Sequence, residues 1–209
     1  MLSRRIQLTS LVMLSIMAAS CGAPRPVKYY IIDTNPPPST SASNQFPVTL
    51  LVGRFVASHL YRDDRLVYGS GPVELGTYEY DRWAEPPADM IQEALISNLR
   101  ASGQYRSVSR VTSSVRGDYV IHGHLISFYG VDKPELVARF SLQLELYNPA
   151  TRTTVWTQAY AHDEPVNEKN VPAIVEAMDK NVAAGIKQLS AGISQYFASH
   201  PPEPAQSGK

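Results

Sequence analysis

One stretch of this chain, residues 137–147, has the cleanest alternation of apolar and polar side chains in the sequence. Its apolar members are Phe140, Leu142, Leu144 and Leu146, and the polar residues between them are Arg139, Ser141, Gln143 and Glu145. Successive side chains of a strand point to opposite faces, so the pattern predicts a strand with one face in the core and the other in water. The turn sequence Asn148-Pro149-Ala150-Thr151 leads into residues 153–161, which predicts an antiparallel hairpin.

The other signals along the chain are runs of strands interrupted by two helices. Strand-forming sequence occurs at residues 29–32, 48–56, 66–68, 73–80, 105–111 and 118–129. One helix is predicted to start at Pro86-Pro87 and to end at Gly103, and a second covers residues 171–197, where apolar residues recur at helical spacing.

This order of elements predicts a single α+β domain over residues 28–199. We expect a mostly antiparallel sheet with both helices packed on one of its faces. The sequence shows no repeats and no second domain. Residues 200–209 are rich in Pro and are predicted to form a disordered tail.

Residues 1–20 have the features of a secretory signal that ends at the only cysteine, Cys21. Arg4 and Arg5 precede an apolar stretch of about 14 residues, which fits a signal peptide and is shorter than the roughly 20 residues that span a bilayer. The sequence Ala-Ala-Ser-Cys is similar to the lipobox of bacterial lipoproteins, except that Ala18 replaces the usual Leu. We therefore predict cleavage before Cys21 and acylation of its thiol. The alternative is a simple secretory signal followed by an incidental cysteine.

The predicted lipidated tether, residues 21–27, is short and would keep the folded domain close to its membrane. Gly22 follows the cysteine directly, at the position where an Asp favours retention in the inner membrane of enterobacteria. We therefore expect a protein that is anchored by lipid to the outer membrane and faces the periplasm. The two or three acyl chains of a bacterial lipoprotein provide stable anchoring.

Composition excludes several classes of function. Without the two arginines of the signal, the 19 Lys and Arg residues fall to 17, against 19 Asp and Glu residues. This balance argues against a nucleic-acid partner, which requires a clustered basic surface. Since Cys21 is the only cysteine, no intrachain disulfide can form, and burial of the 44% hydrophobic residues must stabilise the fold.

Few residues suggest chemistry. His122 and His124 share one face of a predicted strand, as two metal ligands would, but a third ligand would have to come from distant His59, His162 or a carboxylate. We therefore predict no metal site. The pair Asp63-Asp64 is interpreted as part of a solvated charged loop. Glycine-rich phosphate loops and nucleophile elbows are absent from the sequence, and we expect no cofactor and no enzymatic activity.

Three aromatic residues, Tyr78, Tyr80 and Trp83, precede the first predicted helix and are predicted to be exposed in a loop around the end of the strand over residues 73–80. Tyr and Trp are frequent anchors of protein interfaces, so these three residues are candidates for a partner contact. The alternative is that they belong to the core.

The chain resembles the ABC-type transport auxiliary lipoprotein family, including the paraquat-inducible lipoprotein C type. The resemblance rests on the lipobox, on Tyr29-Tyr30-Ile31-Ile32 and on Arg82-Trp83-Ala84-Glu85-Pro86-Pro87, and it covers about residues 21–198. Members of this family are partners of MCE (mammalian cell entry) systems that move phospholipid-like substrates between membranes.

The resemblance implies a non-enzymatic component that docks a periplasmic MCE assembly at the outer membrane. It also implies an inner-membrane permease and ATPase as partners, and a ring of identical subunits as a secondary expectation. Two other classes stay open on the residues alone. One is a structural accessory lipoprotein of another envelope-assembly complex, and the other is a periplasmic hydrolase.

Overall fold

The computed structural model describes residues 25–33, 45–70, 73–112, 116–132 and 135–202. The predicted signal, Cys21 with its predicted acylation, and most of the predicted tail lie outside the described residues. The strands are β1 Lys28–Tyr30, β2 Phe46–Val52, β3 Val56–Ala57, β4 Arg65–Gly69, β5 Leu75–Trp83, β6 Tyr105–Arg110, β7 Tyr119–Val131, β8 Val137–Asn148 and β9 Thr153–Pro165. The helices are α2 Pro87–Ala101 and α3 Val171–Ser199, with a single 3-10 turn at His59–Tyr61.

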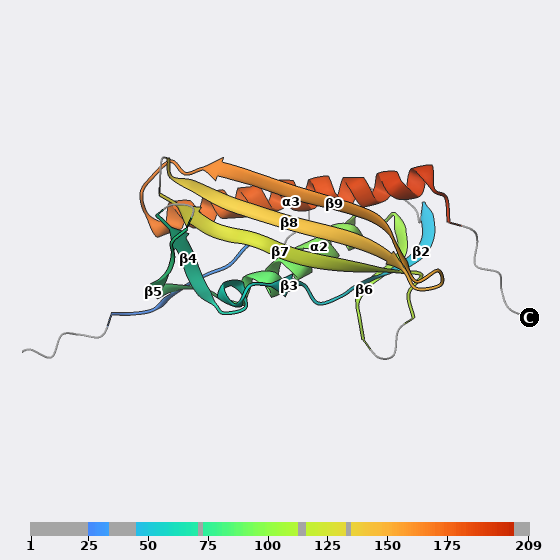
Figure 1. Ribbon diagram of the computed structural model, residues 1–209, viewed down its shortest axis with the longest axis horizontal. Helices are drawn as coiled ribbons and strands as arrows, with labels where there is room; N and C mark the ends of the chain where they lie inside the picture. The colour runs from blue at the N-terminus through green and yellow to red at the C-terminus, as the bar shows by residue number, and fades with distance from the viewer. Residues whose placement is uncertain (1–24, 34–44, 71–72, 113–115, 133–134, 203–209) are drawn as a thin grey trace, which may run out of the picture.

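All nine strands of the described chain form one sheet, and both helices lie on the same face of it (Figure 1). The predicted α+β class is therefore confirmed. The two longest ladders, β7 with β8 and β8 with β9, are antiparallel as expected. The sheet is nevertheless mixed, because β1 pairs with β5 in parallel and three short strands pair with β7 in parallel.

β7 organises the sheet because its two edges are used differently. One edge pairs with β8 along nearly its whole length. The other edge pairs in succession with β2, β3 and β4, opposite residues 119–121, 124–125 and 130–131 respectively. A strand predicted over 48–56 is thus divided into β2 and β3, and the backbone leaves the ladder at Gly53.

The alternation in β8 separates a buried face from an open face, as the sequence predicts. Phe140, Leu142, Leu144 and Leu146 are fully buried under the helices, and the residues between them are half-buried on the open face. Gly185 lets α3 approach the sheet closely, because a Cβ there would lie 2.8 Å from the Phe140 ring and 2.7 Å from the Tyr160 ring.

A buried amide connects the middle of α3 to β8 and β9. The Asn181 side chain is inaccessible to solvent, and its Nδ2 donates to the carbonyl oxygens of Ala138 at 2.8 Å and His162 at 2.9 Å. Its Oδ1 accepts a hydrogen bond from the Tyr160 hydroxyl at 2.9 Å. Buried polar groups are costly unless they are paired, and these three bonds satisfy most of the capacity of the amide.

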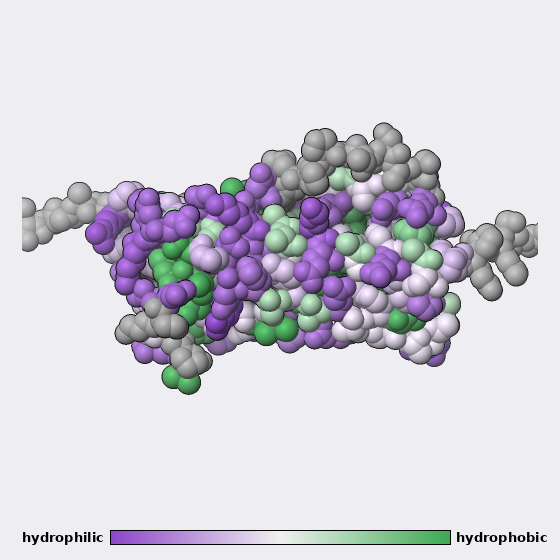
Figure 2. Space-filling view, turned by 90° about the horizontal axis from the view of Figure 1, so that it is seen from above, coloured by the Kyte–Doolittle hydropathy of each residue, from purple (hydrophilic) through white to green (hydrophobic). Residues whose placement is uncertain are grey.

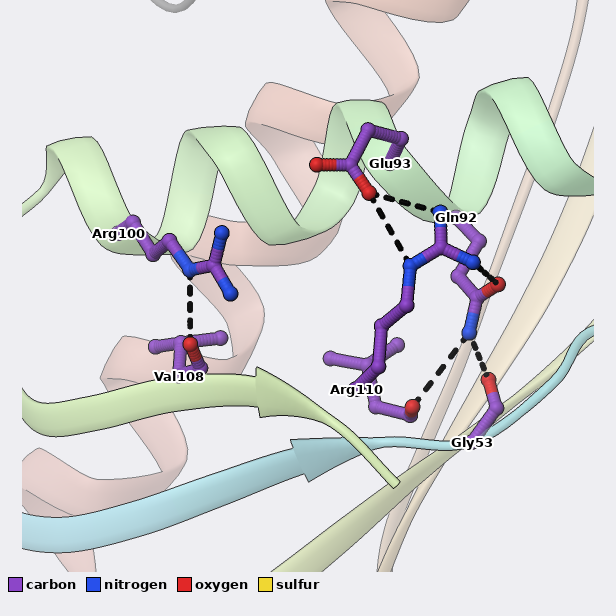
Figure 3. A network of polar contacts seen from close by, with 7 residues as sticks. Gly53, Gln92, Glu93, Arg100, Val108 and Arg110 are labelled. Carbon is purple, nitrogen blue, oxygen red and sulfur yellow. Dashed lines mark hydrogen bonds and ion pairs between the residues drawn. The ribbon is translucent and has the colours of Figure 1, made fainter. Parts of the chain in front are cut away.

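α2 begins and ends as the sequence predicts. Pro86 occupies the N-cap position and Pro87 the first turn, and Gly103 adopts a φ of 61° just beyond the helix. A second buried amide, Gln92, donates to the carbonyl oxygen of Gly53 at 2.7 Å and accepts from Arg110 at 3.2 Å (Figure 3). This network holds α2 over the point at which β2 leaves the ladder.

Two strand boundaries differ from expectation. The first strand ends at Tyr30, although the predicted strand continued to Ile32, and Ile32 is buried beyond its end. The strand predicted to end at Tyr80 continues to Trp83, because β1 adds to its edge with Tyr30 opposite Trp83. Trp83 therefore lies in β5, and its predicted location in a loop is wrong.

Candidate docking surface

The four histidines considered as metal ligands are dispersed over the described chain. His122 and His124 share the open face of β7, where His122 lies opposite Glu145 of β8. His59 belongs to the 3-10 turn, and the His162 ring lies 3.4 Å from Glu164 on β9. Among the described residues, no three His, Cys, Asp or Glu side chains converge as a metal-binding group.

The acidic pair Asp63-Asp64 takes part in hydrogen bonds that stabilise its loop. The Asp64 carboxylate accepts a hydrogen bond from Arg82 Nη1 at 2.7 Å. The backbone carbonyl oxygen of Asp64 accepts another from the backbone N–H of Trp83 at 2.6 Å. Hydrogen bonds with Asp64 hold the pKa of the exposed Asp63 carboxyl below its usual value. These contacts connect the loop to the end of β5.

Trp83 is a core residue, so the prediction that it belongs to an exposed aromatic surface is corrected. Only 3% of it is accessible, and its ring packs against Phe128 with the centroids 5.1 Å apart. The reason lies in the strand itself, since the last residue of β5 faces the helix-covered side of the sheet.

Tyr78 and Tyr80 are both half-buried on β5 and differ in what they contact. Tyr78 packs against Tyr68 of β4, with ring centroids 4.9 Å apart, and burial raises the pKa of its hydroxyl. The Tyr80 ring lies 5.8 Å from the guanidinium of Arg25, at the start of the described chain. Tyr80 therefore stands where the predicted tether joins the sheet.

A groove of about 510 Å³ lies beside Tyr78, between β4–β5 and the beginning of α3. Its apolar lining comes from four separate segments and consists of Tyr68, Tyr78, Leu136, Val171 and Ile174. Figure 2 shows the same feature as a hollow of hydrophobic side chains between hydrophilic margins. The Lys169 ammonium forms a 2.8 Å ion pair with Asp132 at the rim.

Sequence reasoning identified Tyr78 and missed the rest of the groove. Leu136, Val171 and Ile174 carry apolar periodicity that is equally typical of core positions, and their convergence with Tyr68 depends on the sheet order. A groove of this composition can accept an apolar side chain or an alkyl chain. Neither described helix has the length and apolar character together that crossing a membrane requires.

The family model for the ABC-type transport auxiliary lipoprotein component matches residues 30–190, which is most of the folded domain. The chain belongs to this family. It is accordingly a lipoprotein component associated with ABC-type transport. No curated relative matches the chain at a significant level.

Two solved structures show the same fold. Protein XCC0632 from Xanthomonas campestris superposes with a TM-score of 0.74 at 18% identity, over 83% of this chain and 98% of that chain. An uncharacterised protein gives a TM-score of 0.61 at 13% identity, over 81% of this chain and 99% of that chain. At such low identity these similarities concern the fold alone.

Proposed function

We propose that this chain is a non-enzymatic, lipid-anchored subunit of an intermembrane transport system, which docks a periplasmic MCE assembly at the outer membrane. The observation that carries the proposal is the family match over residues 30–190 in a chain whose only cysteine follows a lipobox-like sequence. The lipobox-like sequence before Cys21 and the Gly22 that follows it support an anchor in the outer membrane. The inner-membrane permease and ATPase would be the further partners.

The candidate partner contact is the exposed part of the β5 aromatic surface, Tyr78 and Tyr80. Tyr80 is the stronger candidate because its ring is only partly buried and the guanidinium of Arg25 lies over it at 5.8 Å. Aromatic anchors at interface centres commonly contribute about 2 kcal/mol or more to binding, and partner residues can displace an exposed cation–π contact. The surface would contact either the MCE protein or a second copy of this lipoprotein in a ring.

Purification of the lipidated full chain from detergent-solubilised envelopes tests the proposal. We expect an MCE protein to co-purify, and we expect Tyr80→Ala to lower its recovery roughly tenfold or more, in line with a loss of about 1.4 kcal/mol or more. Tyr147→Ala is the matched control, because Tyr147 is also half-buried but lies on the open face of β8.

The outcome also separates the remaining classes. Recovery of a different envelope complex, without any transport subunit, would favour the structural accessory lipoprotein and contradict the transport role. Turnover of esters or glycans by the purified chain, lost on a single carboxylate or histidine substitution, would favour a hydrolase. Native mass spectrometry of the same sample tests the expected ring of identical subunits.

A further inference from the structure

Exposed apolar side chains gather at the end of the molecule where β4 finishes and β5 starts. Val73 is 95% exposed, Tyr68 41% and Leu75 39%. These residues adjoin the groove lined by Val171 and Ile174, so the exposed side chains and the hydrophobic hollow belong to the same end (Figure 2). Isolated exposed apolar residues are ordinary, whereas a cluster next to an apolar groove indicates a contact surface.

The predicted lipid anchor emerges at this same end. β1 runs parallel to β5 with Lys28 opposite Asp81, so the chain before Lys28 leads back along β5 toward Leu75 (Figure 1). Four Cα–Cα steps separate Cys21 from Arg25, which corresponds to at most about 14 Å of extended chain. The guanidinium of Arg25 lies 5.8 Å from the Tyr80 ring, and Tyr80 is five residues along β5 from Leu75, at most about 17 Å. A tether of this length lets the cysteine that is predicted to be acylated come close to the level of Leu75, and it keeps the anchor in the surroundings of this end.

We propose that this end, through Tyr68, Val73 and Leu75, enters the interfacial layer of the membrane that holds the anchor. The inference rests on the lipidation of Cys21 that the proposed function includes, and it does not require any protein partner. Apolar side chains and amphipathic tyrosine rings are suited to the boundary between headgroups and acyl chains. The groove behind them offers a continuous apolar surface for the upper part of a lipid chain.

Charge at this end distinguishes an apolar contact from electrostatic adsorption. Glu74, Glu135 and Glu168 are exposed there, and the ammonium of Lys169 is already paired with Asp132. Among the described residues, the other exposed cations near this end are Arg25 and Lys28, and they are outnumbered by the carboxylates. Binding driven by anionic lipid would require a basic surface. The contact should therefore depend on apolar insertion, and it should change little with salt or with the fraction of anionic lipid.

Site-specific fluorescence on the lipidated full chain tests this orientation. Val73→Cys is labelled with the polarity-sensitive probe NBD, and the protein is reconstituted into phosphatidylethanolamine and phosphatidylglycerol vesicles that contain lipids with nitroxide groups. Acylation consumes the thiol of Cys21, so the new cysteine is the only thiol that can react. Ala150→Cys, in the exposed turn between β8 and β9 at the opposite end, is the matched control.

We expect the probe at residue 73 to shift to shorter wavelength and to be quenched severalfold more than the probe at residue 150, equally at low and high salt. Equal, weak quenching at both positions would overturn the proposal. Protection of residue 73 from an aqueous quencher without nitroxide quenching would also overturn it, because a protein would then cover the turn. Labelling of two thiols per chain would instead show that Cys21 is not lipidated, which separates failure of the anchor from failure of the contact.

Discussion

Replacement of Asn181 by Ala tests whether a single buried amide fixes α3 on the sheet. The substitution removes all three hydrogen bonds of the side chain, to Ala138, His162 and Tyr160. A typical intramolecular hydrogen bond contributes about 1 kcal/mol, so the three bonds together contribute about 3 kcal/mol. The cavity left at a fully buried position adds to the loss, while the better helix propensity of Ala offsets a few tenths of a kcal/mol.

The coupling between Asn181 and Tyr160 sharpens this estimate. Tyr160→Phe alone removes one bond and should cost about 1 kcal/mol. In the Asn181→Ala background the hydroxyl has already lost its partner, so the second substitution should cost distinctly less. A double-mutant cycle should therefore give an interaction energy of about 1 kcal/mol.

Urea denaturation of the described domain, expressed without its signal, measures these free energies of unfolding. Ser190→Ala is the control on the same helix, because Ser190 Oγ is buried and has no hydrogen-bond partner among the described residues. Its removal should leave stability unchanged or raise it slightly, since an unpaired buried hydroxyl is unfavourable. A loss below about 1 kcal/mol for Asn181→Ala, or strict additivity with Tyr160→Phe, would refute the reasoning.

Three further outcomes follow from individual residues. Trp83→Ala should lower the free energy of unfolding in urea by about 3–5 kcal/mol because Trp83 is buried. Tyr80→Ala should change it by no more than about 0.5 kcal/mol. A mild effect of Trp83→Ala would contradict a core position for Trp83. The hydrogen bond from Arg139 lowers the pKa of Asp163, so this carboxylate stabilises the fold at neutral pH and loses its contribution as the pH falls through its lowered pKa. Asp163→Asn should therefore make stability less dependent on pH between about 5 and 2, by under about 1 kcal/mol since the pair is well exposed, and an unchanged pH profile would count against it. Cys21→Ser should abolish incorporation of radiolabelled palmitate, and incorporation that survives would disprove lipidation at this residue.

Local signals predicted the long elements of the fold well. The alternation over 137–147 identifies β8, the following turn identifies its hairpin with β9, and the apolar spacing over 171–197 identifies α3. Each of these signals arises within a short stretch of chain, because strand period, turn chemistry and helix period are local properties. The Pro-Pro start and the Gly103 end of α2 belong to the same category.

Pairings between distant segments could not be predicted in the same way. The period of a strand shows which face is buried and does not identify the neighbouring strand, so nothing in the sequence around Lys28 indicates a parallel partner in β5. That missing pairing caused the misplacement of Trp83, since a strand at the sheet edge would have no reason to extend so far. The groove was missed for the same reason, because Tyr68, Leu136 and Val171 meet only through the sheet order.

The two proposed contacts impose a geometric condition on each other. Tyr80 lies five residues along β5 from Leu75, which corresponds to about 17 Å, while the 29 residues of α3 extend for about 43 Å toward the opposite end. If the β4–β5 end rests in the membrane interface, a partner that contacts Tyr80 must approach to within about 17 Å of the membrane surface, well below the far end of α3. A partner that instead bound the far end would leave Tyr80 uncovered. A decrease in the solvent exposure of the Tyr80 side chain when a partner is present would therefore support docking close to the membrane. This is the position expected for a subunit that receives an assembly at the bilayer.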